Sequence, residues 1–268
     1  MAEKQRLDIL MVEKGLAESR EKAKEMIMAG QVYIDNQKCD KAGQNVDVTK
    51  TPEIRGETLK YVSRGGLKLE KALRDFGVDP TGMVCSDSGA STGGFTDCLL
   101  QQGAKKVFAI DVGTDQLVDK IRHDPRVVVM EQTNIRYLTS ADLGELLDLS
   151  VVDVSFISLK LVLPAIKGLL KQDCGQVLCL IKPQFEAGKE HIGKKGVIRD
   201  PAVHKQVLDG FVALAHELGF QILGLTHSPV TGPEGNIEFL GHLTLCGVSG
   251  IKPDTAKLVK AAHDTFKV

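Results

Sequence analysis

The sequence contains no tryptophan and only 4% aromatic residues, and its 268 residues carry a formal net charge of -1 at pH 7. A nearly neutral chain gives no argument for nucleic-acid binding from its overall charge, so any basic surface has to be local. Hydrophobic residues make up 43% of the chain. That share is enough for a globular core and argues against intrinsic disorder.

A secretion signal and an uninterrupted apolar run are also missing. The first residues are charged throughout, unlike a signal peptide. The longest apolar stretch, residues 151–170, is interrupted by Asp153, Lys160 and Lys167, which makes a membrane span costly. The six cysteines show neither a CxxC pair nor the Cys/His spacing of a metal site. We therefore expect buried free thiols, no bound metal, no membrane contact and a cytoplasmic location.

Residues 1–59 differ in pattern from the rest of the chain. Apolar residues at helical spacing predict one helix over 6–16 and a second over 19–30, with Ser19 as its N-cap and Gly30 at its end. The following "QVYID" and "DNQK" predict a strand and a turn that leads into another strand. A polar linker is expected at residues 47–60. These elements predict a small N-terminal α+β domain.

From residue 60 to residue 268, strand-like and helix-like stretches alternate. This alternation predicts a Rossmann-like, doubly wound α/β sheet that is mainly parallel. Residues 221–230 and 238–247 both resemble strands, with no helix between them. We expect them to form an antiparallel pair at one edge of the sheet.

A glycine-rich loop, "DSGASTGGF" at residues 87–95, follows a predicted strand. Its glycines match neither GxGxxG nor GxxxxGKS/T, which weakens the case for a nicotinamide cofactor. Asp87 opens the loop and would repel a pyrophosphate, whereas it would attract the cationic end of S-adenosylmethionine. Asp111 ends the next strand, where it can accept hydrogen bonds from a ribose. The pattern favours S-adenosylmethionine, with a plain strand-to-helix turn as the alternative and Asp97 as a first-turn or surface carboxylate.

Four ionisable residues lie at strand ends or at the start of a helix, each flanked by apolar residues: Lys68, Asp153, Lys182 and Glu238. Charged side chains in such settings are costly to bury unless they are paired. Lys182 directly follows "VLCLI", which predicts a buried strand. Most lysines are solvated, but one in this position is a candidate for catalysis.

The N-terminal segment resembles the alpha-L RNA-binding fold of a small-subunit ribosomal protein and of many RNA-modifying enzymes. The matching pieces are Arg6-Leu7-Asp8, residues 19–23 and residues 29–32. The resemblance implies RNA binding. We expect contacts from Arg6, Arg20, Lys24 and Arg64, although a solvated surface charge is the alternative for each of them.

The chain from Tyr61 onward resembles the FtsJ-type ribose 2'-O-methyltransferases, and the whole chain resembles the TlyA family of ribosomal RNA 2'-O-methyltransferases. The resemblance rests on "SRGGLKL", "DSGASTGGFTDCLL", "AIDVG", "DVSFISL", "IKPQFE", "KGVIRD" and "EGNIEF" in this order. It implies methylation of a cytidine ribose in ribosomal RNA or ribosomal subunits, with a catalytic set of Lys68, Asp153, Lys182 and Glu238. The implied S-adenosylmethionine site comprises Asp87, Ser88, Gly89, Ala90, Gly93, Gly94, Phe95, Asp111, Val112, Thr133, Asn134 and Asp153.

One segment departs from the family pattern. Some members join the domains by Arg-X-Trp-Val, whereas this chain has Leu59-Lys60-Tyr61-Val62, so coupling through the linker is in doubt. Three alternatives stay open: a membrane-active haemolysin, a non-catalytic ribosome-assembly factor and a nicotinamide oxidoreductase. Residues 186–200 are expected to form a basic, mobile loop that contacts RNA, or a plain surface loop.

Overall fold

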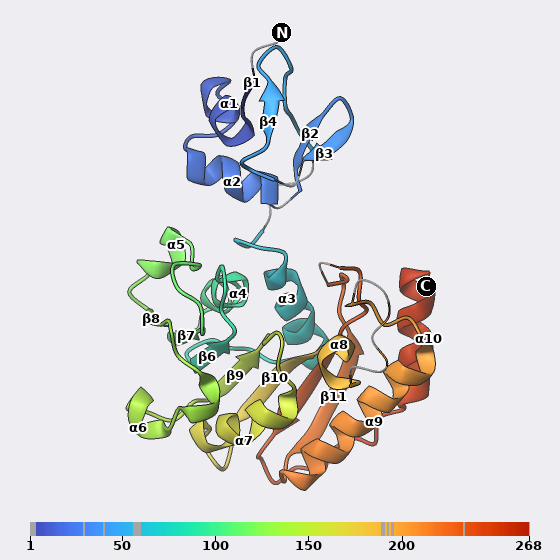
Figure 1. Cartoon of the computed structure of the whole chain (residues 1–268). Helices are drawn as coiled ribbons and strands as arrows, with labels where there is room; N and C mark the ends of the chain where they lie inside the picture. Colours follow the sequence, from blue (N-terminus) through green and yellow to red (C-terminus); the bar gives the residue numbers. More distant parts are fainter. Residues whose placement is uncertain are drawn as a thin grey trace. The chain divides into compact units, whose positions relative to one another are not determined.

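The computed structural model describes residues 4–28, 30–39, 41–55, 60–188, 191, 193, 196–232 and 234–267. The chain divides into two compact units, Met1–Arg64 and Gly65–Val268 (Figure 1). Ala29 and Leu59, which belong to two of the motifs above, lie outside the described residues. So do five residues of the predicted basic loop, namely Lys189, Glu190, Ile192, Lys194 and Lys195.

The N-terminal unit combines two helices with two small antiparallel sheets. Strand β1 pairs with β4, and β2 pairs with both β3 and β5. The helices contact each other, and their apolar faces meet the strands in one core around Leu7, Met11, Ile27 and Val32. Its elements are β1 (Lys4–Arg6), α1 (Leu7–Glu13), α2 (Arg20–Met28), β2 (Val32–Ile34), β3 (Gln37–Cys39), β4 (Asn45–Asp47) and β5 (Glu53–Ile54).

Both predicted helices of this unit are confirmed, and so is the predicted turn. The hydroxyl of Ser19 accepts a hydrogen bond from the backbone N–H of Lys22 at 3.1 Å, as an N-cap does. Gly30 follows α2 with a φ of +72°, which suits a glycine that ends a helix. The prediction of a linker over 47–60 is partly wrong, because β4 ends inside it and β5 forms there. Strand β5 has only two residues, too few to show an alternating pattern.

The larger unit has a single seven-stranded sheet and helices throughout its length. Its elements are α3 (Gly65–Phe76), β6 (Val84–Ser88), α4 (Gly94–Gln101), β7 (Lys106–Ile110), α5 (Asp119–Arg122), β8 (Val127–Met130), η1 (Ile135–Tyr137), α6 (Ser140–Leu143), β9 (Leu149–Val152), α7 (Leu159–Leu169), β10 (Gln176–Ile181), α8 (Pro183–Glu186), α9 (Pro201–Glu217), β11 (Gln221–His227), β12 (Phe239–Thr244) and α10 (Thr255–Phe266).

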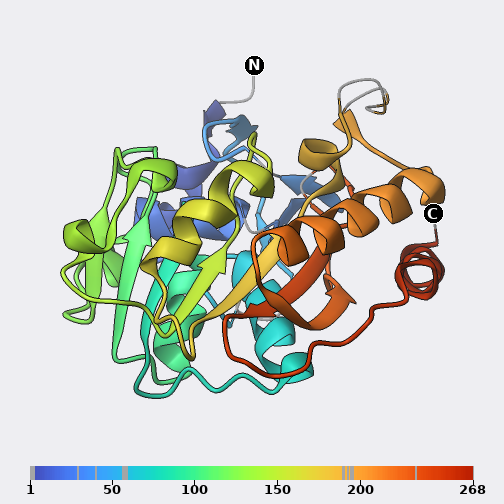
Figure 2. The same ribbon diagram turned by 90° about the horizontal axis from the view of Figure 1, so that it is seen from below.

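The strand order is β11-β12-β10-β9-β6-β7-β8, and only β12 runs antiparallel to its neighbours. Helices α7 and α9 cover one face of the sheet, and α3 and α4 cover the other (Figure 2). The predicted doubly wound sheet and its antiparallel edge pair are both confirmed. From β6 the chain proceeds outward to β7 and β8, and then returns to β9 on the other side. In such folds, ligands bind beyond the carboxyl ends of the strands at this reversal, which here are β6 and β9.

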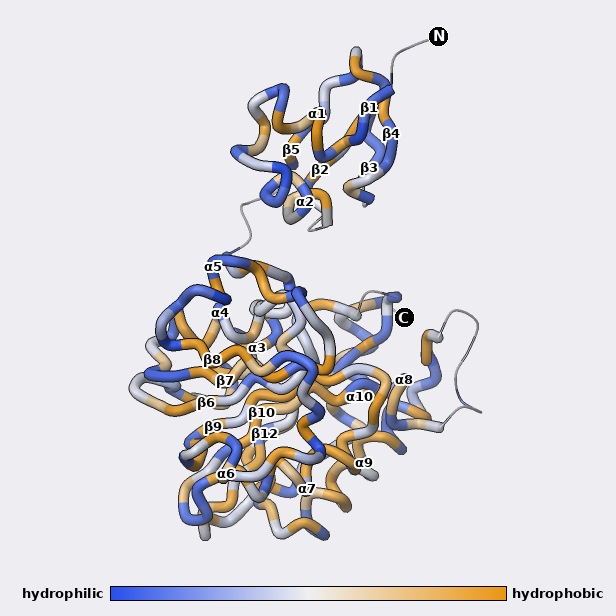
Figure 3. The backbone as a smooth tube through the Cα atoms, turned by 60° about the vertical axis from the view of Figure 1, so that its left-hand side comes forward, coloured by the Kyte–Doolittle hydropathy of each residue, from blue (hydrophilic) through white to orange (hydrophobic). Residues whose placement is uncertain are grey.

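The central strands are apolar and buried. Residues 177–181 of β10 are each no more than 2% exposed, as expected for a strand covered by helices on both faces. Hydrophobic stretches gather along the central strands and their covering helices (Figure 3). Cys39, Cys85 and Cys179 are buried free thiols, as predicted, and Cys98 is also buried, whereas Cys174 is exposed. None of the helices in the described ranges combines the length and hydrophobicity that a membrane crossing requires.

Two helical segments differ from expectation. One of the helix-like stretches, residues 115–125, forms a helix only over the four residues of α5, because Asp115 has a φ of +52° and Val118 is extended. The C-terminal helix α10 was not predicted. The carboxylate of Asp254 accepts a hydrogen bond from the N–H of Lys257 and caps it, and the helix packs on α9 and β11.

Candidate active site

The glycine-rich loop joins β6 to α4 and lies close against two neighbouring strands. The N–H groups of Gly89 and Ala90 both donate to the carbonyl of Ile110, at the end of β7. A Cβ at Gly89 would lie 2.5 Å from the carbonyl oxygen of Asp153, just beyond β9. Gly89 has a φ of +89° and Gly93 has one of +94°, so both use the conformational freedom that the sequence suggested. The loop is therefore built for close backbone approach at the switch point of the sheet.

Asp87 is fully buried at the end of β6. Its Oδ2 accepts hydrogen bonds from the backbone N–H and the hydroxyl of Thr96, at 2.9 and 2.7 Å. Its Oδ1 and the hydroxyl of Ser88 have no hydrogen-bond partner within the described residues. Burial raises the pKa of Asp87 to about 7, against the opposing effect of Thr96 and with smaller contributions from Asp153 and Asp111. The strand end thus holds polar atoms that suit a ligand with hydrogen-bond donors.

Asp111 ties together the loops that follow β6 and β7. Its Oδ2 accepts from the N–H of Ser91 at 2.8 Å, and its Oδ1 from the N–H of Gly113 at 2.7 Å. Val112, beside it, is 69% exposed. A narrow crevice at this place is lined by Asp111 together with Ala90, Ser91, Ala109, Gly113, Gln116, Leu117, Val129 and Glu131. Sequence reasoning missed Gln116 and Glu131, although Glu131 directly follows β8 and could have been found from that position.

Thr133, Asn134 and Phe95, which were also predicted to hold the cofactor, are not among the residues that line this crevice. The N–H of Thr133 donates to the carbonyl of Asp111, and the Asn134 side chain accepts from the N–H of Arg136 and caps η1. Phe95 is buried in α4. Asp97 lies in the first turn of α4, as expected, but it is buried and forms an ion pair with Lys120 at 3.3 Å.

The four predicted catalytic residues form two buried ion pairs. The Nζ of Lys68 lies 2.6 Å from Oε2 of Glu238, and the Nζ of Lys182 lies 2.6 Å from Oδ1 of Asp153. Lys182 also donates to the hydroxyl of Ser155 at 2.8 Å. Lys68 and Lys182 are only 8% and 7% exposed, and Glu238 is 1% exposed. A charge this deeply buried requires a partner. Lys68 is hydrogen-bonded to Glu238, whereas Lys182 is hydrogen-bonded to Ser155 and in ion-pair contact with Asp153.

Strand register explains why these residues share one edge of the sheet. Ile181 of β10 pairs with Phe239 of antiparallel β12, so Lys182 and Glu238 leave the sheet side by side. Cys179 pairs with Val152 of parallel β9, which puts Asp153 at the same edge. Lys68, from the first turns of α3, completes the group through its ion pair with Glu238.

An exposed aromatic residue that sequence reasoning did not single out lies beside these pairs. Phe156 is 91% exposed and has a φ of +63°, a conformation that is uncommon for a bulky residue. Its ring centroid lies 5.1 Å from that of Phe185. Glu186 anchors this region, because its carboxylate accepts from the Ser158 hydroxyl and from the N–H of Leu159. Phe156 directly follows "DVS", and this position was the signal from which the sequence could have identified it.

All four predicted RNA-contacting residues belong to the N-terminal unit, and the last of them, Arg64, directly precedes α3. Arg6 and Arg20 both reach the carboxylate of Asp8, Lys24 is half-buried and Arg64 is exposed. In the described part of the chain, no group of three or more His, Cys, Asp or Glu side chains is placed to hold a metal ion.

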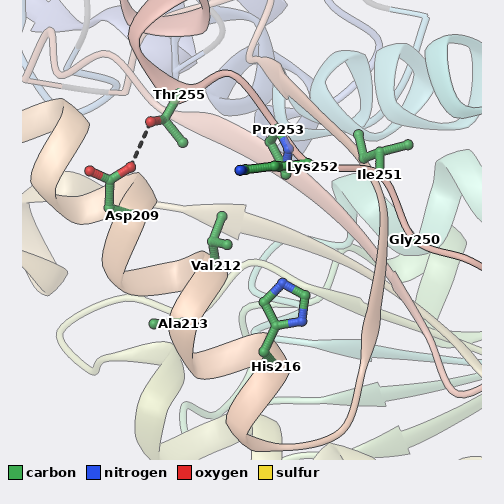
Figure 4. A pocket seen from close by; sticks show the side chains of 9 residues that line it. All are labelled: Asp209, Val212, Ala213, His216, Gly250, Ile251, Lys252, Pro253 and Thr255. Atoms are coloured by element: carbon green, nitrogen blue, oxygen red, sulfur yellow. Dashed lines mark hydrogen bonds between the residues drawn. The ribbon is translucent and has the colours of Figure 1, made fainter.

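A second groove lies elsewhere on the larger unit (Figure 4). It measures about 560 Å³ and lies between α9 and the segment before α10. Val212 and His216 project from α9, and Lys252 faces them. The hydroxyl of Thr255 donates a hydrogen bond to the carboxylate of Asp209 at 2.6 Å. None of the predicted site residues lines it, so we assign the chemistry to the strand ends and not to this groove.

Comparison with known proteins identifies the family to which the larger unit belongs. Residues 61–245 match the FtsJ-like methyltransferase family. The chain belongs to this family. Residues 5–50 match the S4 domain, and both matches agree with the resemblances found in the sequence. Membership of this family implies S-adenosylmethionine as the methyl donor and argues against the alternative of a nicotinamide oxidoreductase.

Several known proteins resemble this FtsJ-like methyltransferase over most of its length. The chain is 45% identical to the Mycobacterium tuberculosis protein named 16S/23S rRNA (cytidine-2'-O)-methyltransferase TlyA, over 89% of both chains. It is 42% identical to Hemolysin A of Brachyspira hyodysenteriae, over 90% of this chain and 100% of that protein. A solved Streptococcus thermophilus structure, described as a candidate hemolysin, has a TM-score of 0.79 at 47% identity and covers 100% of this chain and 98% of its own.

The close approach at Gly89 gives a direct test of the loop geometry. Gly89→Ala puts a methyl group 2.5 Å from the Asp153 carbonyl oxygen, so we expect it to lower the free energy of unfolding by about 1–3 kcal/mol and to weaken binding of S-adenosylmethionine. The measurements are urea denaturation and calorimetric titration. Gly82→Ala is the control, because Gly82 also has a positive φ, +74°, but no heavy atom lies within 4 Å of the added carbon. Equal effects of the two substitutions would contradict this account.

Proposed function

We propose that this FtsJ-like methyltransferase transfers a methyl group from S-adenosylmethionine to the ribose 2'-hydroxyl of a cytidine in ribosomal RNA. The observation that carries the proposal is the pair of buried lysine–carboxylate ion pairs beside the glycine-rich loop, at one edge of the sheet. The name of the Mycobacterium tuberculosis relative supports the substrate. We assign RNA binding to residues 1–59, catalysis to residues 60–268, and the reaction to the cytoplasm.

The strand ends fit S-adenosylmethionine. Asp87 Oδ1 and Ser88 Oγ are buried polar atoms without partners in the described ranges, and the cofactor's amino group is a donor that could satisfy them. Asp87, Asp111 and Asp153 make the edge negative, which suits a ligand with an ammonium and a sulfonium. When bound, the cofactor supplies an electrophilic methyl group. Residues 88–94 would cradle its methionine end, Asp111 and Val112 its ribose, and Thr133 and Asn134 its adenine.

The protonation of Asp87 makes cofactor affinity depend on pH. The carboxyl binds a cation only when ionised, and its pKa is raised to about 7, so we expect affinity to fall as pH falls below 7, by at most about tenfold per pH unit. Asp87→Asn should weaken binding and remove this slope. Calorimetric titration between pH 5.5 and 7 checks both expectations. Asp97→Asn is the control, since Asp97 is engaged with Lys120, and a slope that survives in Asp87→Asn would refute the assignment.

The ion pairs supply what methylation of a ribose requires. A 2'-hydroxyl is weakly acidic and a poor nucleophile, so it needs proton removal or charge stabilisation together with alignment to the methyl group. In the transfer, the ribose oxygen would bond to the methyl carbon as the carbon–sulfur bond breaks, and the hydroxyl proton would have to be removed. As the ammonium of its ion pair, Lys182 would stabilise the charge on this oxygen; it would accept the proton only if its Nζ had first released one to solvent. Asp153 and Ser155 hold its Nζ in place, and Lys68–Glu238 orients the hydroxyl.

Lys182→Met tests the reaction itself. We expect methyl transfer to ribosomal subunits to fall by about 10²–10⁴-fold, with cofactor binding retained. Transfer is measured with labelled S-adenosylmethionine, followed by digestion to nucleosides to show whether the label is on ribose and on which base. Lys160→Met, at the exposed start of α7, is the matched control. Full activity in Lys182→Met would sink the catalytic assignment, and wild-type protein that binds cofactor without transfer would favour the assembly-factor alternative.

Phe156 gives the target nucleotide a surface on which to stack. Its exposed ring directly follows Ser155, which contacts Lys182, and aromatic faces stack on bases with about 1–3 kcal/mol per base. We infer that the cytosine rests on this ring while its ribose faces Lys182.

Substitution of Phe156 should act on substrate binding. We expect Phe156→Ala to raise the KM for ribosomal subunits about tenfold or more, in line with the loss of one stacking contact, whereas Phe156→Trp stays near wild type. Steady-state kinetics measure the difference. Leu161→Ala removes another exposed apolar side chain, 53% exposed on α7, and should change nothing. Equal KM values for Phe156→Ala and wild type would argue against stacking.

A further inference from the structure

The N-terminal unit contains a buried carboxylate that the proposed chemistry does not use. Asp8, the second residue of α1, is 0% exposed. Its Oδ1 accepts from the Nε of Arg6 and from the N–H of Ile9, both at 3.0 Å. Its Oδ2 accepts from the Nη2 atoms of Arg6 and Arg20, at 2.8 and 3.2 Å. One carboxylate oxygen is therefore shared by two guanidinium groups.

The two arginines come from different elements but are brought to one place. Arg6 ends β1, and Arg20 begins α2. Their side chains stay 44% and 49% exposed, so each presents part of its guanidinium group to solvent. Gly43 adds room at this place, because a Cβ there would lie 3.3 Å from Nη1 of Arg6. Two positive charges share one negative charge, and the group keeps a net charge of about +1.

We propose that Asp8 is the positioning residue of a phosphodiester-binding site, in which it holds Arg6 and Arg20 ready to contact the RNA backbone. The proposal rests on the proposed function, since it concerns how the RNA substrate is held. An arginine loses about 2 kcal/mol of rotamer entropy when it is fixed. Because Asp8 fixes the arginines when the protein folds, this entropy is lost before RNA binds and does not lower the affinity for RNA. The planar guanidinium fork also matches a phosphate in geometry.

The charge state of Asp8 makes the test decisive. Hydrogen bonds from Arg6, then from Arg20, lower its pKa to about 2 against the effect of burial. Asp8→Asn therefore removes a full negative charge at neutral pH. If Asp8 only neutralised the arginines, this loss would strengthen binding to a polyanion. If Asp8 positions them, binding becomes weaker, so the two roles predict opposite signs.

The experiment uses the full chain and a fluorescein-labelled RNA hairpin from ribosomal RNA, followed by fluorescence anisotropy over a series of salt concentrations. We expect Asp8→Asn to weaken binding about tenfold. We also expect the slope of log affinity against log salt to become shallower by about one to two, as one or two phosphate contacts are lost. Thermal melting and circular dichroism of the same samples establish that the variant is folded.

Two further variants make the result specific. Asp35→Asn is the control, because it changes the net charge of the same unit by the same amount. Asp35 is exposed and pairs with Lys50. Its φ of +52° is one that asparagine tolerates. This variant should leave affinity unchanged or slightly increase it. Arg20→Lys keeps the charge and the buried carboxylate but loses the guanidinium fork. It should weaken binding as Asp8→Asn does, and it carries the test if Asp8→Asn does not fold.

The failures are distinguishable. If folded Asp8→Asn binds RNA as tightly as the wild type or more tightly, the positioning role is overturned while RNA binding stands. If Asp8→Asn is unfolded, the same result with Arg20→Lys overturns it. A wild-type chain that does not bind the hairpin would overturn the phosphodiester site. If that same wild-type chain still methylates ribosomal subunits, the proposed function survives without this site.

Discussion

The candidate active site depends on the pairing of charges at the edge of an apolar sheet. Lys68 and Lys182 are almost completely buried, and each lies 2.6 Å from a carboxylate oxygen. Removal of either partner would leave an uncompensated charge in a poorly solvated place, which is far more costly than the loss of a surface pair. Buried pairs of this kind are weak evidence for stability as such. Their presence where two strands end is therefore better explained by chemistry than by folding.

The sheet topology determines where these pairs can form. The chain leaves β6 in one direction and returns to β9 in the other, so the loops that follow them separate at one edge. Antiparallel β12 begins at that same edge, which brings Glu238 beside Lys182 although 56 positions separate them in the chain. Gly89 then allows the cofactor loop to pass within contact distance of Asp153. The carboxylate that holds Lys182 thus also adjoins the loop proposed to hold the methyl donor.

Much of this could be predicted from sequence, and the successes share a physical cause. The buried strands and the helices that cover them have strong apolar patterns, and the four ionisable residues stood out because charge interrupts such patterns. Strands β2 and β3 are about as short as β1, β4 and β5, but the turn between them made them predictable, whereas the other three have no such signal. Helix α10 was not predicted, since it follows the last expected strand, residues 238–247, and continues no alternation of strand and helix. Phe156 was missed for another reason: its exposure and backbone conformation depend on the loop anchored by Glu186, far along the chain.

Both units use a carboxylate to hold cations in place, but they do so under different solvation. The side chains of Lys182 and its partner Asp153 are only 9% and 20% exposed, so added salt screens their interaction less than it screens a surface pair. Arg6 and Arg20 keep nearly half of their side-chain surface exposed around the buried Asp8, and their attraction for a phosphate is screened by salt. Moderate salt would therefore weaken the hold on RNA while leaving the catalytic pairs intact. This separation follows from burial alone. It would allow a chain with almost no net charge to combine the proposed salt-sensitive contact for RNA with a proposed catalytic group that salt disturbs less.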